Sequence, residues 1–102
     1  MPHELVYTEL AIASLDWLEI HDKPRAKKVH KTLGLMEVNL RHPGLNSHKM
    51  GGMTAPDGRD LFEVYVENNT PGAFRILYCF GPAPNQLTIL AITKHLPDRS
   101  KK

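Results

Sequence analysis

The chain has 102 residues, a formal net charge of +2 and a single cysteine, Cys79. This length predicts one domain over residues 1–102, and one cysteine excludes an internal disulfide. A net charge this small does not by itself indicate a nucleic-acid-binding protein. The sequence contains no apolar stretch of membrane-spanning length and no evident secretory signal, so we expect a cytoplasmic protein without a membrane partner.

The first half of the chain predicts one strand followed by two helices. β-Branched and aromatic residues favour a short strand over residues 4–8. A small apolar face predicts a helix over residues 11–21, with Ser14 as its N-cap. A second helix starts at Asp22 and runs to about residue 40, because its apolar residues recur at spacings of three and four.

The second half predicts a long loop and then three strands. Residues 45–59 contain glycines, a proline and a turn signal, which are typical of a loop, and part of it could enter the sheet as an extended edge. Strands are predicted over residues 60–67, 73–80 and 86–95, and the short connections between them favour antiparallel neighbours. The predicted fold is therefore α+β, in the order β-α-α-β-β-β. It contains a small, mainly antiparallel sheet with both helices packed on one face.

Several ionisable residues fall on the sheet face that two helices cannot cover, which we call the open face. Alternation along the strands places Glu63, Tyr65 and Arg75 there. His95 ends the last strand, and a slip of one residue in register would exchange it with Lys94, so both are candidates. A simple cross-strand ion pair is the competing explanation for Glu63 and Arg75.

An acid, an arginine and a histidine or lysine on one shallow face suit phosphodiester chemistry. A general base takes the proton of the attacking hydroxyl, an arginine stabilises charge on the phosphoryl oxygens, and a general acid protonates the leaving oxygen. RNA supplies its own nucleophile, the 2′-hydroxyl, so this chemistry needs no metal or cofactor. The histidines show no metal-ligand spacing. Basic clusters at residues 23–31 and 94–102 either contact phosphates or form solvated surfaces.

Three short motifs and the order of elements resemble the RelE/ParE superfamily of toxins from bacterial type II toxin–antitoxin systems, and most of all its RelE/HigB-like branch. The motifs are Asp60-Leu-Phe-Glu-Val-Tyr-Val, Ala73-Phe-Arg-Ile-Leu-Tyr and Ile89-Leu-Ala-Ile-Thr-Lys-His. The helix that carries Trp17 and the long second helix that ends near Pro43 fit the same pattern.

This resemblance implies a toxin that cleaves mRNA, commonly in the ribosomal A site, by attack of the 2′-hydroxyl on the neighbouring phosphate. Arg75 matches the family arginine that stabilises the pentacovalent phosphate. Glu63 matches an acid of the preceding strand and is a candidate general base. Lys94 or His95 matches the residue that ends the last strand and acts as acid or base.

The resemblance also implies contacts with RNA and with protein partners. The candidate RNA-binding residues are Lys27, Lys28, Lys31, His48, Lys49 and Tyr65. The implied partners are a cognate antitoxin, mRNA and the ribosome. Leu61 and Leu77 fit an apolar groove on the open face for an antitoxin segment. Two alternatives stay open: a non-enzymatic growth inhibitor, as ParE-like members act on DNA gyrase, and a chain that only binds its antitoxin.

Overall fold

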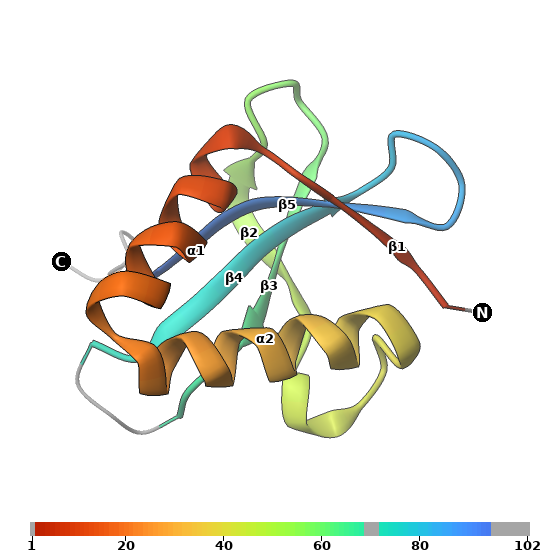
Figure 1. Ribbon diagram of the computed structural model, residues 1–102. Coiled ribbons are helices and arrows are strands. Elements are labelled where there is room, and N and C mark those ends of the chain that lie inside the picture. Colours follow the sequence, from red (N-terminus) through yellow and green to blue (C-terminus); the bar gives the residue numbers. More distant parts are fainter. Residues whose placement is uncertain (1, 69–71, 95–102) are drawn as a thin grey trace, which may run out of the picture.

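We analysed a computed structural model, which describes residues 2–68 and 72–94. Its elements are β1 (Glu4–Tyr7), α1 (Glu9–His21), α2 (Lys23–Val38), the short 3-10 helix η1 (Pro43–Leu45), β2 (His48–Thr54), β3 (Asp60–Tyr65), β4 (Phe74–Phe80) and β5 (Gln86–Lys94). The strands form one sheet in the order β1-β5-β4-β3-β2, with both helices on the same face (Figure 1). Only the β1–β5 pair is parallel among these strands. The predicted α+β fold is confirmed.

The two helices start at side-chain caps. Thr8, rather than the predicted Ser14, caps α1, because its hydroxyl accepts a hydrogen bond from the Ala11 N–H at 3.1 Å. The same hydroxyl donates to the Leu90 carbonyl at 2.9 Å, which fastens the start of α1 to β5. Asp22 caps α2 as predicted by accepting from the Arg25 N–H at 3.2 Å. No helix in the described part of the chain is long and apolar enough to cross a membrane.

The hydrophobic core lies between the helices and one face of the sheet. Its buried members are Ala11, Leu18, Ala26, Val29, Leu33, Met36, Leu45, Val64, Ile76, Tyr78, Leu87, Ile89 and Ile92. The apolar stripe predicted in the second helix therefore packs in the core. Removing apolar surface of this kind from water supplies most of the driving force for folding.

Strand β2 lies inside the region predicted to be a loop and is the extended edge considered for part of it. Its edge position explains why the sequence pattern of a strand is weak here. Six of its seven residues are exposed, so it has no buried face to impose an alternating apolar pattern. The pairs His48–Glu63 and Lys49–Phe62 fix its start against β3, and Thr54 pairs with Asp60 after a shift in register. Gly52, at φ +75°, lies in the irregular part, where a residue with a side chain would be strained.

A shift in register in β5 alters which side chains share a face. Leu77 pairs with Ala91, whereas Tyr78 pairs with Ile89, so Leu90 is the extra residue of a bulge. Ile89 consequently joins Tyr78 in the core, while Ala91 lies on the open face. Uninterrupted alternation over the predicted strand at residues 86–95 would put Ile89 and Ala91 on one face, so a period of two alone is wrong for this strand.

The open face is partly covered, and the predicted apolar groove on it is not exposed. Leu61 is 5% exposed and Leu77 is 8% exposed. The Arg59 side chain reaches across this end of the sheet, donating to the Phe80 carbonyl at 3.0 Å and approaching the Thr88 hydroxyl at 3.4 Å. Burial also raises the pKa of the Cys79 thiol, which disfavours the nucleophilic thiolate and fits a packing residue.

Glu67 joins α2 to the sheet just after β3. Its carboxylate accepts from Arg25 Nε at 3.0 Å, from Lys28 Nζ at 3.1 Å and from the Phe74 N–H at 3.1 Å. Burial alone would raise the pKa of this carboxyl, but hydrogen bonds from Lys28, a backbone N–H and Arg25 outweigh burial and hold the pKa below its ordinary value.

Substitution Glu67→Gln should lower the free energy of unfolding at pH 7 by about 2 kcal/mol, because charge-assisted hydrogen bonds are lost. The native pKa of Glu67 is depressed, so this stabilisation is complete above the unfolded pKa of about 4.3 and is lost as the pH falls through the lower native pKa. Urea unfolding between pH 3 and 7 should therefore show the difference from wild type shrinking on the acid side. Asp16→Asn, at an exposed position of α1, is the control, and a difference independent of pH would contradict this role for Glu67.

Candidate functional site on the open face

Four polar side chains gather on the open face where β2, β3 and β4 lie side by side. They are His48, Glu63, Tyr65 and Arg75, and we call them the open-face site. The register places them together because His48 pairs with Glu63, and Tyr65 pairs with Arg75. Cross-strand partners project from the same face of a sheet. The structure thus brings together three residues predicted for this face and adds His48.

His48 and Glu63 form the ionic half of the open-face site. His48 Nε2 lies 3.0 Å from Glu63 Oε1, and His48 Nδ1 lies 2.7 Å from the Asn46 carbonyl oxygen. Both ring nitrogens face oxygen acceptors, so both contacts are satisfied when the imidazole carries two protons and Glu63 is a carboxylate. The Glu63 side chain is 3% exposed, whereas that of His48 is 41% exposed. His48 is therefore accessible from solvent, and Glu63 lies beneath it.

Arg75 and Tyr65 form the other half. The guanidinium carbon of Arg75 lies 3.8 Å from the centre of the Tyr65 ring. Arg75 Nη1 donates to the Glu67 carbonyl at 2.7 Å and to the Phe74 carbonyl at 3.1 Å, which fixes the plane of the guanidinium. Within residues 2–68 and 72–94, Arg75 Nε has no hydrogen-bond partner. A buried donor in that state is uncommon and points to a functional group rather than a packing residue.

Tyr65 connects the two halves. Its ring meets the His48 ring edge-on, with the centroids 5.8 Å apart. The simple cross-strand ion pair considered for Glu63 and Arg75 is not the arrangement found, because Glu63 pairs with His48 and lies opposite Leu77 in the ladder.

The two remaining catalytic candidates are Lys94, the last residue of β5, and His95, the next residue of the sequence. Lys94 pairs with Phe74, whose side chain packs against the core, so Lys94 projects from the helix face rather than from the face of Arg75. Only a slip of one residue in register would have placed Lys94 beside Arg75, and the pairing at this end of β5 shows no such slip. Thr93 pairs with Arg75 instead. His95 lies outside the described residues, and its role stays a prediction from the sequence.

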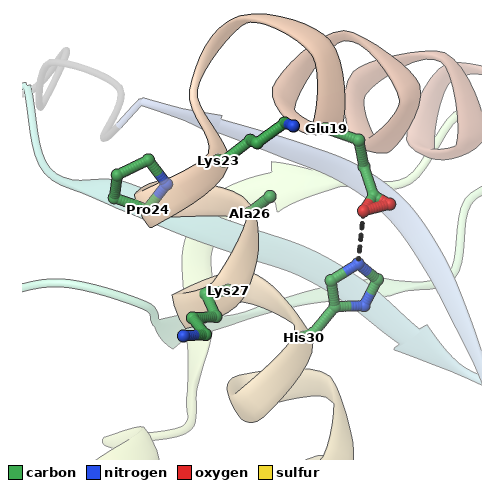
Figure 2. Close-up of a pocket in the computed structure, with 6 residues that line it drawn as sticks. All are labelled: Glu19, Lys23, Pro24, Ala26, Lys27 and His30. Carbon is green, nitrogen blue, oxygen red and sulfur yellow. Dashed lines mark ion pairs between the residues drawn. The ribbon is translucent and has the colours of Figure 1, made fainter.

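The predicted RNA-binding lysines of α2 lie away from the open-face site. Lys28 pairs with Glu67, and Lys27 lines a hollow between α1 and α2 (Figure 2). In the same hollow His30 Nε2 lies 3.4 Å from Glu19 Oε1. Lys31 is an exposed residue of the same helix. Because α2 covers the opposite face of the sheet, these lysines do not adjoin Arg75.

Lys49 is also separated from Arg75. It pairs with Phe62 across the ladder, and its Nζ lies 3.4 Å from Asp60 Oδ2. It therefore projects from the face opposite the open-face site. Among the described residues, no group of three or more histidine, cysteine, aspartate or glutamate side chains could hold a metal ion.

His48 is the member of the site whose role the sequence understates. The sequence indicates RNA contact for it, whereas the structure makes it the direct partner of Glu63. No local pattern signals that pairing, because it depends on β2, which has almost no apolar periodicity.

The structure resembles solved toxins over nearly its whole length. It matches a YoeB/ParE toxin from Agrobacterium tumefaciens with a TM-score of 0.70 at 12% identity, covering 91% of this chain and 99% of that one. It matches a chain of an archaeal RelE–RelB complex from Pyrococcus horikoshii with a TM-score of 0.65 at 14% identity, covering 92% of this chain and 96% of that one. A YoeB dimer from Staphylococcus aureus matches at 0.64 and 15% identity, covering 94% and 100%.

Sequence comparison adds nothing to this structural likeness. No protein-family model matches the chain, and no curated protein matches it by sequence. The RelE/ParE-like fold predicted from the motifs is confirmed by the structural neighbours, and at these identities the likeness establishes the fold alone.

Proposed function

We propose that this chain, which has the fold of the RelE and YoeB toxins, is the toxin of a type II toxin–antitoxin pair and an endoribonuclease that cuts mRNA. The observation that carries the proposal is the open-face site. It combines an exposed histidine held by a buried carboxylate with a fixed, buried arginine that has an unpartnered donor. Those are two of the three groups that metal-independent cleavage by a 2′-hydroxyl uses: a proton donor for the leaving oxygen and a cation for the phosphoryl oxygens.

In the proposed reaction, the 2′-oxygen loses its proton and attacks the adjacent phosphorus. The bond from phosphorus to the 5′-oxygen then breaks, and that oxygen takes up a proton. The products are a 2′,3′-cyclic phosphate and a 5′-hydroxyl. Arg75 stabilises the negative charge on the non-bridging oxygens in the transition state, because its guanidinium is already oriented by two carbonyls.

His48 is the proposed general acid. Its Nδ1 proton is held on the Asn46 carbonyl in the substrate-free structure and is the one available for transfer, because Glu63 binds the other ring nitrogen. Glu63 orients the ring and stabilises its positive charge, as a buried carboxylate does for the histidine of a catalytic triad. This replaces the sequence-based role of Glu63 as base, since a side chain 3% exposed does not meet a substrate. The base is assigned to His95, on the sequence alone.

An antitoxin is the proposed protein partner. Similar solved structures include complexes of RelE with RelB, YoeB with YefM and YafQ with DinJ. In this chain, the large exposed apolar side chains lie mainly on α1 rather than on the open face, and they include Leu10, Trp17 and Ile20. Positions 10, 17 and 20 share one stripe of the helix. A partner helix with an apolar stripe of its own would cover that surface.

Controlled expression in a bacterial host tests the toxin proposal. The wild type should arrest growth and produce new transcript 5′ ends that carry hydroxyl groups, because cleavage leaves a 5′-hydroxyl. A His95→Ala variant should arrest growth more weakly and yield fewer of these ends. Growth arrest without new 5′ ends would instead favour inhibition by binding, as in the alternative of a gyrase inhibitor. Normal growth with the chain stably expressed would favour a chain that only binds its antitoxin.

A further inference from the structure

A pocket of about 710 Å³ opens on the helix face of the sheet, beyond the C-terminal end of α2. Its lining residues come from the chain between α2 and β2 and from the exposed ends of the sheet strands. We call it the aromatic pocket, and its lining consists of Leu40, Arg41, His42, Pro43, Asn46, Ser47, His48, Lys49, Phe62, Tyr78 and Phe80. Pockets of this size accommodate small organic ligands.

Three aromatic rings form one side of the aromatic pocket. The Phe62 and Tyr78 rings stack, with centroids 5.5 Å apart and planes 27° apart. Phe80 stands edge-on to both, with centroids 5.0 Å from Phe62 and 5.7 Å from Tyr78. Tyr78 is buried and its hydroxyl is hydrogen-bonded to that of Ser47, whereas Phe80 is 47% exposed. Phe80 therefore offers ring surface to a ligand, and Tyr78 forms the rigid base beneath it.

Every ionisable side chain in this lining other than Tyr78 is a cation or a histidine. Arg41 and Lys49 are charged, His42 and His48 are histidines, and the lining includes no carboxylate. His42 Nδ1 accepts a hydrogen bond from the Gly44 N–H at 3.0 Å, so its Nε2 is the nitrogen that carries a proton and can donate. The composition favours a ligand that is flat and apolar at one end and anionic at the other.

The aromatic pocket and the open-face site meet at His48. His48 is one of the residues that line the pocket, and its imidazole is bound to Glu63 on the other face. This is possible because β2 is the edge strand, so a ligand can pass around it from one face to the other without crossing the sheet. Lys49, the next residue, projects into the pocket side of the same edge.

We propose that the aromatic pocket binds a nucleotide of single-stranded RNA that flanks the scissile phosphate, with its base on Phe80 and its phosphate at Arg41 and Lys49. The proposal rests on the proposed function, since it assigns a second subsite to the same substrate. Aromatic rings beside basic groups are the usual means of holding unpaired nucleotides, because every base has a face that stacks. The RNA strand would then bend around the edge of the sheet at His48.

Binding of an oligoribonucleotide that cannot be cleaved tests this without depending on catalysis. A fluorescently labelled, fully 2′-O-methylated decamer is titrated with the intact chain, and anisotropy gives the dissociation constant. Phe80→Ala should weaken binding by about 5- to 150-fold, the loss expected for one stacked base. Val38→Ala, an exposed apolar residue at the end of α2 outside the lining, should leave binding unchanged.

The phosphate contact is tested by the salt dependence. Arg41→Gln should make the plot of log K against log salt shallower by about 0.7, the value for one phosphate of a single strand. Lys23→Gln removes the same charge from α2 and should leave the slope unchanged. Equal changes for both variants would mean non-specific attraction only and would overturn the subsite.

Two further results would also overturn it. One is wild-type RNA affinity in folded Phe80→Ala. The other is loss of antitoxin binding in Phe80→Ala with RNA binding intact, which would make the pocket a protein-docking site. The proposed function fails by a different result. If the wild type cleaves no RNA but Phe80→Ala still weakens decamer binding, the subsite stands and the nuclease proposal does not. Thermal unfolding of each variant identifies any loss of fold.

Discussion

Substitution Arg75→Ala should reduce RNA cleavage by about 10²- to 10³-fold, the usual cost of removing one preorganised donor to a developing negative charge. The guanidinium stacks on Tyr65 at 3.8 Å and is tied to two backbone carbonyls, so it is oriented before substrate arrives. Arg75 is only 7% exposed, and alanine therefore removes packing as well as charge. Cleavage should be measured at single turnover, with circular dichroism and thermal unfolding on the same samples.

Arg75→Lys separates chemistry from folding. Lysine keeps the positive charge but has no planar guanidinium. It therefore does not bond to both carbonyls and at the same time offer an oriented donor to the phosphate, so cleavage should fall while the fold survives. Arg25→Lys is the matched control, because Arg25 also stacks on an aromatic ring, at 4.6 Å from the centre of Phe74, but on the helix face. It should cost stability and leave the cleavage rate near that of the wild type. A wild-type rate for folded Arg75→Lys would contradict the role of Arg75.

Glu63→Gln should reduce cleavage by about 10²- to 10⁴-fold, the range expected when a general acid is lost. Glutamine has nearly the same shape but no charge, so it does not stabilise a doubly protonated His48 ring across the 3.0 Å contact. His48→Asn removes the proton donor itself and should have an effect of the same size. Rates at saturating substrate, with Kd for the uncleavable decamer, separate chemistry from binding.

The two substitutions should not add. If Glu63 acts only through His48, the variant with both changes should be no slower than His48→Asn alone. Glu19→Gln is the matched control, since Glu19 also pairs with a histidine, His30 at 3.4 Å, but between α1 and α2. It should leave the rate near that of the wild type. Multiplicative effects of Glu63→Gln and His48→Asn would contradict the orienting role and support a separate function for Glu63.

The part of the fold built from buried strands was predictable because those strands carry the alternating pattern. The placement of Val64 and Ile76 in the core, and of Tyr65 and Arg75 on the open face, follows from a period of two. The helical stripes were predictable for the same reason, with a period of 3.6. These elements carry Arg75, and this is why its position in the site could be reached from the sequence.

What the sequence did not reveal depends on backbone geometry without side-chain periodicity. Strand β2 is an exposed edge rich in glycine, so the sequence indicated only that part of this segment could extend the sheet, and the pairing of His48 with Glu63 leaves no signature. The bulge at Leu90 shifts the faces of β5 by one residue within an unbroken apolar run. Thr8 rather than Ser14 caps α1, since tertiary contact with β5 favours the earlier start.

The identity of the nucleophile is the most direct test of the proposed function. Two RNAs are compared. The first is an all-ribose RNA in which the cut made by the wild type has been mapped, and the second is the same RNA with a single 2′-deoxynucleotide on the 5′ side of that cut. Each is tested both free and as mRNA on ribosomes. We predict cleavage of the first RNA, leaving a 2′,3′-cyclic phosphate, and none of the second at that position. Equal cleavage of both RNAs, or cleavage of neither by a chain that arrests growth, would contradict RNA cleavage by the 2′-hydroxyl on the open face.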